Sequence, residues 1–180
     1  MKVRVRLAAV VAVLAALAIA VATAVAGGGG GGANIKERLS GYQEVPAIST
    51  PATGEFRAKL RPKSGEITYR LSYSALSGPV QQAHIHVGQF SVNGGISVFL
   101  CSNLGNGPAG TQPCPPGPAT IEGTIRPANV IGPAAQGVSA GEFNELVAAI
   151  AAGVTYANVH SETFPGGEIR SQLRSHPGDD

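Results

Sequence analysis

The composition lacks several features that common function classes require. The chain of 180 residues has no tryptophan, only 5 % aromatic residues and 13 % charged residues, and this charged share is about half the usual one. These shortages exclude a coiled coil, a helical repeat and a nucleic-acid binder that relies on a basic face. Glycine (25 residues) and proline (13 residues) are abundant instead, which favours a turn-rich, mostly β domain with a core of Val, Ile, Leu and Ala.

Side chains for acid–base and nucleophilic catalysis are also scarce. The only aspartates are the last two residues, Asp179 and Asp180, so we expect no aspartate at a buried site. No Gly-x-Ser-x-Gly motif is present, which argues against a hydrolase with a catalytic triad. The sequence also has no glycine-rich phosphate loop between a strand and a helix, and this excludes the nucleotide-binding α/β folds.

The beginning of the sequence has the pattern of an export signal. Three basic residues, at positions 2, 4 and 6, precede an apolar or small stretch over 7–26, which ends in the A-x-A cleavage site Ala24-Val25-Ala26. This pattern predicts a secretory signal peptide and therefore a secreted or cell-envelope protein. An uncleaved membrane anchor is the alternative, because about 20 apolar residues span a bilayer. Without the three basic residues, ten basic and eleven acidic residues remain, which gives no argument for nucleic-acid binding.

The rest of the chain is expected to form one exported domain with short flanks. The expected segments are a signal peptide or anchor at 1–26, a glycine-rich linker at 27–37, a β domain at 38–174 and a polar tail at 175–180. Within the domain, Cys101 and Cys114 lie in a stretch rich in Pro, Gly and Asn. In an oxidising compartment such a pair is expected to form a disulfide, and a metal site made from two thiols so widely spaced is the weaker interpretation.

Alternation of apolar and polar residues predicts the strands. In residues 55–61, Phe56, Ala58 and Leu60 alternate with charged residues, which is typical of a half-buried strand. Eight strands are expected in all, at 38–42, 55–61, 66–73, 80–87, 96–100, 120–125, 155–160 and 168–174. Short strands separated by turns predict an all-β fold, an antiparallel Greek-key sandwich or barrel.

One short helix is expected before the seventh strand. Ser139 and Glu142 form a capping-box pattern, and Gly153 is placed to end the helix. The apolar residues between them recur with the helical period and form one stripe: Phe143, Leu146, Val147 and Ile150. We expect this helix to cover an open end or edge of the barrel.

Three histidines are the main candidates for chemistry. His84 and His86 share one face of an expected strand, and the apolar residues around them take the core face. His160 alternates with core residues in the same way, so all three are expected on the outer face of the barrel. Imidazoles suit copper and zinc, and three of them leave a coordination position open. The alternative is that these are polar residues that hydrogen-bond across the sheet or to the loop at 164–168.

Two further residues are candidates for hydrogen bonds to these imidazoles that would fix their tautomers. They are Asn158, which alternates with His160, and Glu168. For Glu168 we also consider a cross-strand ion pair with an arginine, because it alternates with Arg170 on its strand. His176 lies in the polar tail and is expected to be solvated. No catalytic residue is predicted.

Five short blocks of the sequence follow the order of a known family. They are 39–46 (LSGYQEVP), 52–54 (ATG), 83–88 (AHIHVG), 153–160 (GVTYANVH) and 164–173 (FPGGEIRSQL). Together they resemble the CHRD (chordin) domain, which implies a secreted or surface-anchored β domain and supplies no mechanism. The blocks also resemble, more weakly, Cu,Zn superoxide dismutase, a Greek-key barrel with an H-x-H strand. This chain lacks the usable aspartate and the additional histidines that the two-metal enzyme needs.

Two hypotheses of different classes follow. The first is an extracellular or cell-envelope binding or structural module with an unidentified surface partner, held at a membrane only through an uncleaved leader. The second is a metal-binding protein in which His84, His86 and His160 hold copper or zinc. Neither hypothesis involves nucleic acid, and neither requires an enzyme.

Overall fold

The fold is built from antiparallel strands. The computed structural model describes residues 32–178, so the predicted leader, its cleavage site and the two terminal aspartates lie outside the described residues. The strands are β1 (Ala33–Ser40), β2 (Thr53–Arg61), β3 (Glu66–Ser74), β4 (Val80–Val87), β5 (Gly95–Ser102), β6 (Ala119–Ile125), β7 (Thr155–Ser161), β8 (Ile169–Leu173) and β9 (Ser175–Pro177). They are joined by one helix, α1 (Phe143–Ala151), and by 3-10 turns at Gly41–Gln43, Pro62–Ser64, Pro127–Asn129 and Ala134–Gln136.

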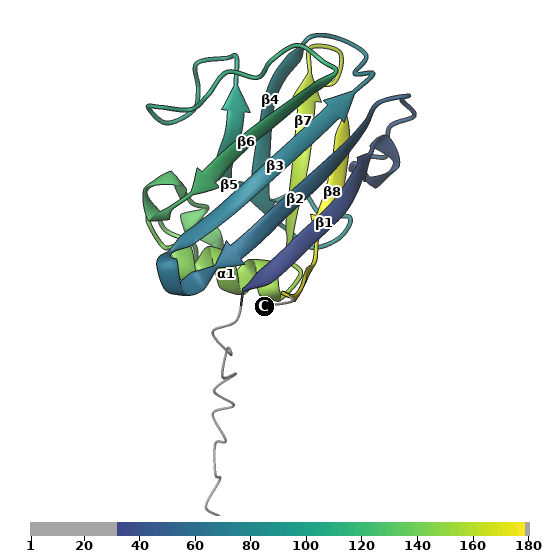
Figure 1. Ribbon diagram of the computed structural model, residues 1–180. Coiled ribbons are helices and arrows are strands. Elements are labelled where there is room, and N and C mark those ends of the chain that lie inside the picture. The colour runs from purple at the N-terminus through teal and green to yellow at the C-terminus, as the bar shows by residue number, and fades with distance from the viewer. Residues whose placement is uncertain (1–31, 179–180) are drawn as a thin grey trace, which may run out of the picture.

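Eight of the strands form one curled sheet in the order β5-β4-β7-β8-β1-β2-β3-β6, and β9 pairs with β1. In Figure 1, β6, β3, β2 and β1 pass in front of β5, β4, β7 and β8, so the sheet folds back on itself as a nearly closed barrel. The prediction of an all-β antiparallel fold with a single short helix is confirmed. Within residues 32–178, no helix is long and apolar enough to cross a membrane.

The β2–β3 hairpin shows how alternation produces the core. The two strands pair along their whole length, from Thr53 opposite Ser74 to Arg61 opposite Glu66. This register places Phe56 opposite Leu71, and both side chains are fully buried. The turn between the strands ends at Gly65, whose φ of 65° lies in the left-handed region that favours glycine.

Two of the expected segment boundaries were wrong. β1 begins at Ala33 and not at residue 38, and it pairs with β2 from its first residue, so residues 33–37 belong to the sheet and not to a linker. Ile35 supplies the buried apolar residue of this segment, which the charged residues after it obscured. At the other end, residues 175–177 form β9, and Asn34 pairs with His176. The expected polar tail is therefore partly a strand, although His176 is exposed as predicted.

The predicted helix packs at one end of the barrel, the lower end in Figure 1. Phe143, Leu146 and Ile150 are buried, and the helix ends before Gly153, which has a φ of 69°. Only half of the predicted capping box is present. The carboxylate of Glu142 accepts a hydrogen bond from the Ser139 backbone N–H (2.6 Å), but no side chain of the described residues caps the helix N-terminus.

The barrel is open between its two edge strands, β5 and β6, and the loop after β5 bridges this gap. The predicted disulfide between Cys101 and Cys114 is confirmed, and it ties the loop to β5. The Gln112 side chain of this loop donates hydrogen bonds to the carbonyl oxygens of Leu100 on β5 and Glu122 on β6. The loop thus links the two edge strands, β5 and β6, through hydrogen bonds.

Candidate metal centre

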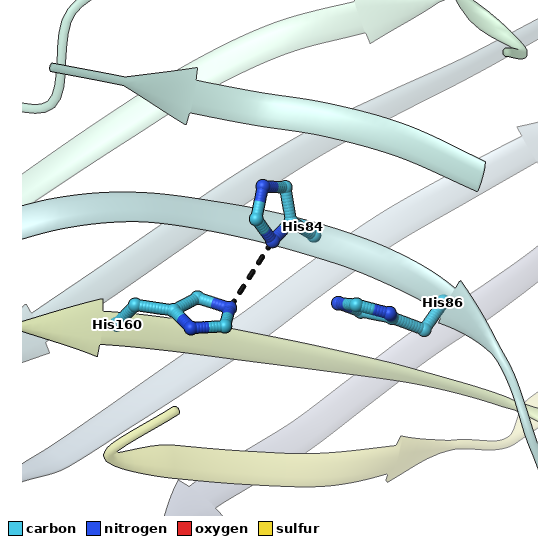
Figure 2. A group of neighbouring side chains, drawn as sticks. All are labelled: His84, His86 and His160. Atoms are coloured by element: carbon cyan, nitrogen blue, oxygen red, sulfur yellow. Dashed lines mark hydrogen bonds between the residues drawn. The ribbon is translucent and has the colours of Figure 1, made fainter. Parts of the chain in front are cut away.

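The structure brings the three predicted histidines together on two neighbouring strands. His84 and His86 lie on β4, and His160 lies on β7, which pairs with β4. Figure 2 shows the three rings converging, with His84 hydrogen-bonded to His160 and the His86 ring directed toward both. One ring nitrogen from each residue lies within 4.8 Å of those of the other two. This is the only group of three or more potential metal ligands within residues 32–178.

The histidines project from the outer face of the barrel, as expected, but they are not exposed to solvent. His84 is fully buried, and His86 and His160 are 7 % and 6 % exposed. The loop between β4 and β5 contributes the Gly94 carbonyl to His86, and the loop between β7 and β8 contributes the Pro165 carbonyl to His160. These two loops fold over the outer face of the sheet, so a polar face becomes a dry site.

The two loop carbonyls determine where the imidazole protons lie. A carbonyl oxygen only accepts hydrogen bonds, so Nδ1 of His86 (3.0 Å from Gly94 O) and Nδ1 of His160 (2.9 Å from Pro165 O) must both be protonated. In the neutral rings, both Nε2 atoms therefore carry a lone pair. His84 Nδ1 lies 3.1 Å from His160 Nε2 and donates its proton to it.

Burial keeps these imidazoles neutral. It lowers the pKa of His84 to about 2, with further lowering from neighbouring His160 and His86. Burial also lowers the pKa of His86 to about 4, against the raising effect of its hydrogen bond to Gly94. The pKa of His160 is lowered for the same reason, against the effect of its bond to Pro165. Neutral imidazoles are the form that binds metal ions, so at neutral pH protons do not compete with a metal.

The nitrogen positions are compatible with copper or zinc after a small movement. With metal–nitrogen bonds of about 2.0–2.1 Å, the 3.1 Å separation of His84 Nδ1 and His160 Nε2 corresponds to an angle of about 100° at the ion. A separation of 4.8 Å is wider than two such bonds can span, so the most distant ring must move by roughly 1 Å. An ion at His84 Nδ1 also requires the proton to move to His84 Nε2, which has no hydrogen-bond partner in the part of the chain that the structure describes.

A buried arginine, Arg170, holds one side of this site, and no role in the site was predicted for it. The His86 ring stacks on the Tyr156 ring (4.6 Å between centroids, 2° between planes), and the Arg170 guanidinium lies 3.4 Å from the Tyr156 centroid. Since β7 lies between β4 and β8, His86 and Arg170 occupy opposite faces of the tyrosine ring. Arg170 is 1 % exposed, and it has no carboxylate at salt-bridge distance among the described residues.

Arg170 instead fastens the loop that covers the site. Its guanidinium donates hydrogen bonds to the carbonyl oxygens of Gln89 and Val92 and to the Asn93 side chain. These residues belong to the segment 89–93, which leads to Gly94, whose carbonyl orients His86. Arg170 is therefore linked to His86 both through the tyrosine stack and through this loop.

Of the two residues predicted to support the histidines, the structure brings one to them. Asn158 on β7 pairs directly with His84 on β4 and with Arg170 on β8, and its amide lies beside the His86 ring and the Glu44 carboxyl group. Glu44 is 6 % exposed, and burial raises its pKa to about 7 despite the opposing effect of the nearby Arg170 charge.

Glu168 hydrogen-bonds to hydroxyl groups and not to a histidine. Its carboxylate accepts hydrogen bonds from the Thr50 hydroxyl (2.6 Å) and from the Ser77 hydroxyl and backbone N–H (2.7 and 2.9 Å). Burial by itself would raise the pKa of Glu168, but these bonds and one from Ser161 lower it below its usual range. The alternative of a cross-strand ion pair with an arginine was wrong, because the carboxylate is used to tie two loops to the barrel.

The period-two alternation of the strands could have identified some of the site residues that were not predicted. Tyr156, Asn158 and His160 occupy alternate positions of β7 and so share the face that carries the site. Arg170 shares it too, since it pairs with Asn158. No comparable signal existed for Glu44, which reaches the site from the loop after β1.

Comparison with known proteins identifies one family. The model of the CHRD domain matches residues 35–173, which span the barrel from β1 to β8. No curated protein and no solved structure matches the chain significantly.

Proposed function

This chain belongs to the CHRD domain family, and we propose that it is an exported member that binds one copper or zinc ion through His84, His86 and His160. The observation that carries this proposal is the tautomeric state of the site. Two loop carbonyls hold the Nδ1 protons of His86 and His160, so both Nε2 lone pairs face a common buried space. Backbone carbonyls play this part behind metal-binding histidines in many proteins.

A purely structural role explains these histidines less well. Nε2 of His84 and Nε2 of His86 are buried, and neither has a hydrogen-bond partner within residues 32–178. Leaving one such group unsatisfied costs about 1–3 kcal/mol, so three histidines packed for stability alone would be a poor choice. An ion that accepts the lone pair of His86 Nε2 removes one of these costs directly.

The ligand set favours copper or zinc among the common metals. Imidazole suits both ions, and copper(II) generally binds such a set more tightly than zinc. Both cysteines of the chain are in the disulfide and supply no thiolate. The loops over the site restrict access to it, which supports storage or delivery of the ion more than catalysis on a large substrate. The disulfide and the leader pattern support action outside the cytoplasm.

The direct test is metal content followed by titration. The full chain would be produced in an export host without an affinity tag, and its bound metal measured by mass spectrometry. The metal-free protein would then be titrated with Cu(II) and Zn(II). We expect near-stoichiometric binding that is lost in His84→Ala. His176→Ala is the matched control, because it removes the one exposed histidine of β9 and should leave binding unchanged. Equal affinity of wild type and His84→Ala would refute the proposal.

A second candidate function is recognition of a surface partner. Tyr42 (74 % exposed) and Phe90 (64 % exposed) are large side chains that the barrel leaves in solvent. They lie on two loops that are joined by a hydrogen bond from the Asn93 side chain to the Val45 carbonyl. If the protein binds neither metal, a binding module that uses this surface becomes the preferred function.

A further inference from the structure

The three imidazoles are not the only acceptors that face the metal position. We propose that Asn158 supplies an oxygen donor to the bound ion and that Glu44 orients it, so that the site selects a divalent ion over Cu(I). This inference rests on the proposed function, because it concerns the same site and requires that the site bind metal.

The strand register places Asn158 at the centre of the polar face. It is directly opposite His84 on one side and directly opposite Arg170 on the other. Directly opposed residues in an antiparallel pair have Cβ atoms about 4.5–5.5 Å apart, so their side chains lie in contact range. His160 is two positions further along β7, on the same face. Asn158 itself is 2 % exposed, so its amide has no access to bulk water.

The amide is oriented with its nitrogen toward Glu44. Asn158 Nδ2 and Glu44 Oε1 both lie next to Gly167, and the amide oxygen, Oδ1, is the other arm of the amide, on the side of His86. Gly167 makes room for this pair: a Cβ atom at that position would lie 2.6 Å from Glu44 Oε1 and 2.9 Å from Asn158 Nδ2. The absence of a side chain at residue 167 thus permits Glu44 to hold the amide in one orientation.

Two acceptors therefore meet without a donor between them. Asn158 Oδ1 and His86 Nε2 are both buried, and neither has a hydrogen-bond partner among residues 32–178; their side chains lie on the neighbouring strands β7 and β4. His86 has no proton to offer at Nε2, since its Nδ1 proton is held by Gly94. Two buried lone pairs that face each other repel, and a cation between them satisfies both.

An amide oxygen at this position discriminates between ions. It is a hard donor, which divalent ions accept and which the soft ion Cu(I) does not favour. Glu44 adds to the same preference, because it is the carboxyl group that contacts Asn158 and can balance the second positive charge. The Arg170 guanidinium acts in the opposite direction, so without Glu44 the net charge around the site would disfavour a divalent ion.

The test compares Zn(II) with Cu(I) in the full chain and in two variants. Metal-free wild type, Asn158→Leu and Gln172→Leu would each be titrated with Zn(II), and anaerobically with Cu(I) against a competing chelator. Gln172 is the matched control, because it is a buried amide on β8 that donates its hydrogen bonds to the Gly88 and Gly153 carbonyls and, among the described residues, makes none to the histidines. We expect Asn158→Leu to weaken Zn(II) binding by about tenfold or more while Cu(I) binding changes little. Gln172→Leu should leave the ratio of the two affinities unchanged.

Each failure has a distinct signature. If wild type binds neither ion, the proposed function falls. If wild type binds both ions and Asn158→Leu keeps the wild-type ratio, only the role of Asn158 is refuted. Should Asn158→Leu fail to fold, Asn158→Asp retains an oxygen at the same place. It is expected to keep or strengthen Zn(II) binding relative to Cu(I), and a loss of Zn(II) preference would overturn the inference. In Cu(II)-loaded protein, electron paramagnetic resonance should show a changed ligand field in Asn158→Leu but not in Gln172→Leu.

Discussion

The metal-free protein should lose stability on mild acidification, and replacing His84 measures the part of this loss that comes from that one residue. His84 is fully buried, and its folded-state pKa is about 2 against an ordinary value of 6.5. Between these two values the unfolded chain takes up a proton that the folded protein excludes. The stabilisation from neutral His84 is therefore fully present above pH 6.5 and is lost progressively as the pH falls toward 2.

The magnitude follows from the width of this window. At pH 5, which is 1.5 units below the ordinary pKa, a contribution of about 1.4 kcal/mol per unit gives a loss of about 2 kcal/mol from His84 alone. His84→Leu places an apolar side chain of similar size at the position, and this side chain cannot take up a proton. Titrating groups distant from the site are present in both proteins and cancel in the comparison.

Urea unfolding at pH 7 and pH 5, with a chelator present and the disulfide intact, would measure this difference. At pH 7 the variant should be the less stable protein, because His160 Nε2 loses its proton donor. On moving to pH 5, the stability difference should shift by about 2 kcal/mol in favour of His84→Leu. A difference that is the same at both pH values would show that His84 is not held neutral by burial, and the account of the dry site would be wrong.

Three further perturbations test how the site is supported. Replacing both Cys101 and Cys114 by Ser should lower the free energy of unfolding by about 3 kcal/mol, seen as a lower urea midpoint, and an unchanged midpoint would contradict this. Arg170→Met removes the hydrogen bonds to the loop after β4, so the amide hydrogens of that loop should exchange faster than in wild type, while those of α1 should not. If the loop exchanges at the same rate in both proteins, Arg170 does not anchor it. Gly167→Ala places a Cβ 2.6 Å from Glu44 Oε1 at a φ of 127°, and calorimetry should show a destabilisation of about 2 kcal/mol or more.

The local alternation of apolar and polar residues was sufficient to predict most strands of the barrel, because a strand with one buried face has a period of two. Phe56, Ala58 and Leu60 alternate with charged residues, and all three are buried in β2. The pattern failed at the start of β1, where Ile35 is followed by Lys36 and Glu37 and the apolar signal is a single residue. Pairing with β2 made this segment a strand, which is a non-local effect.

Local patterning establishes which side chains make up the site: two histidines on one strand face, a third on another strand, and an asparagine two residues before the third. Tertiary packing decided that these groups are buried, because the two covering loops have polar, turn-forming sequences that carry no periodicity. It also decided that Arg170 faces a tyrosine ring and a loop, and that Glu44 reaches Asn158 from a distant turn. Such contacts join residues far apart in the chain, and they depend on strand order and loop path, which side-chain alternation does not encode.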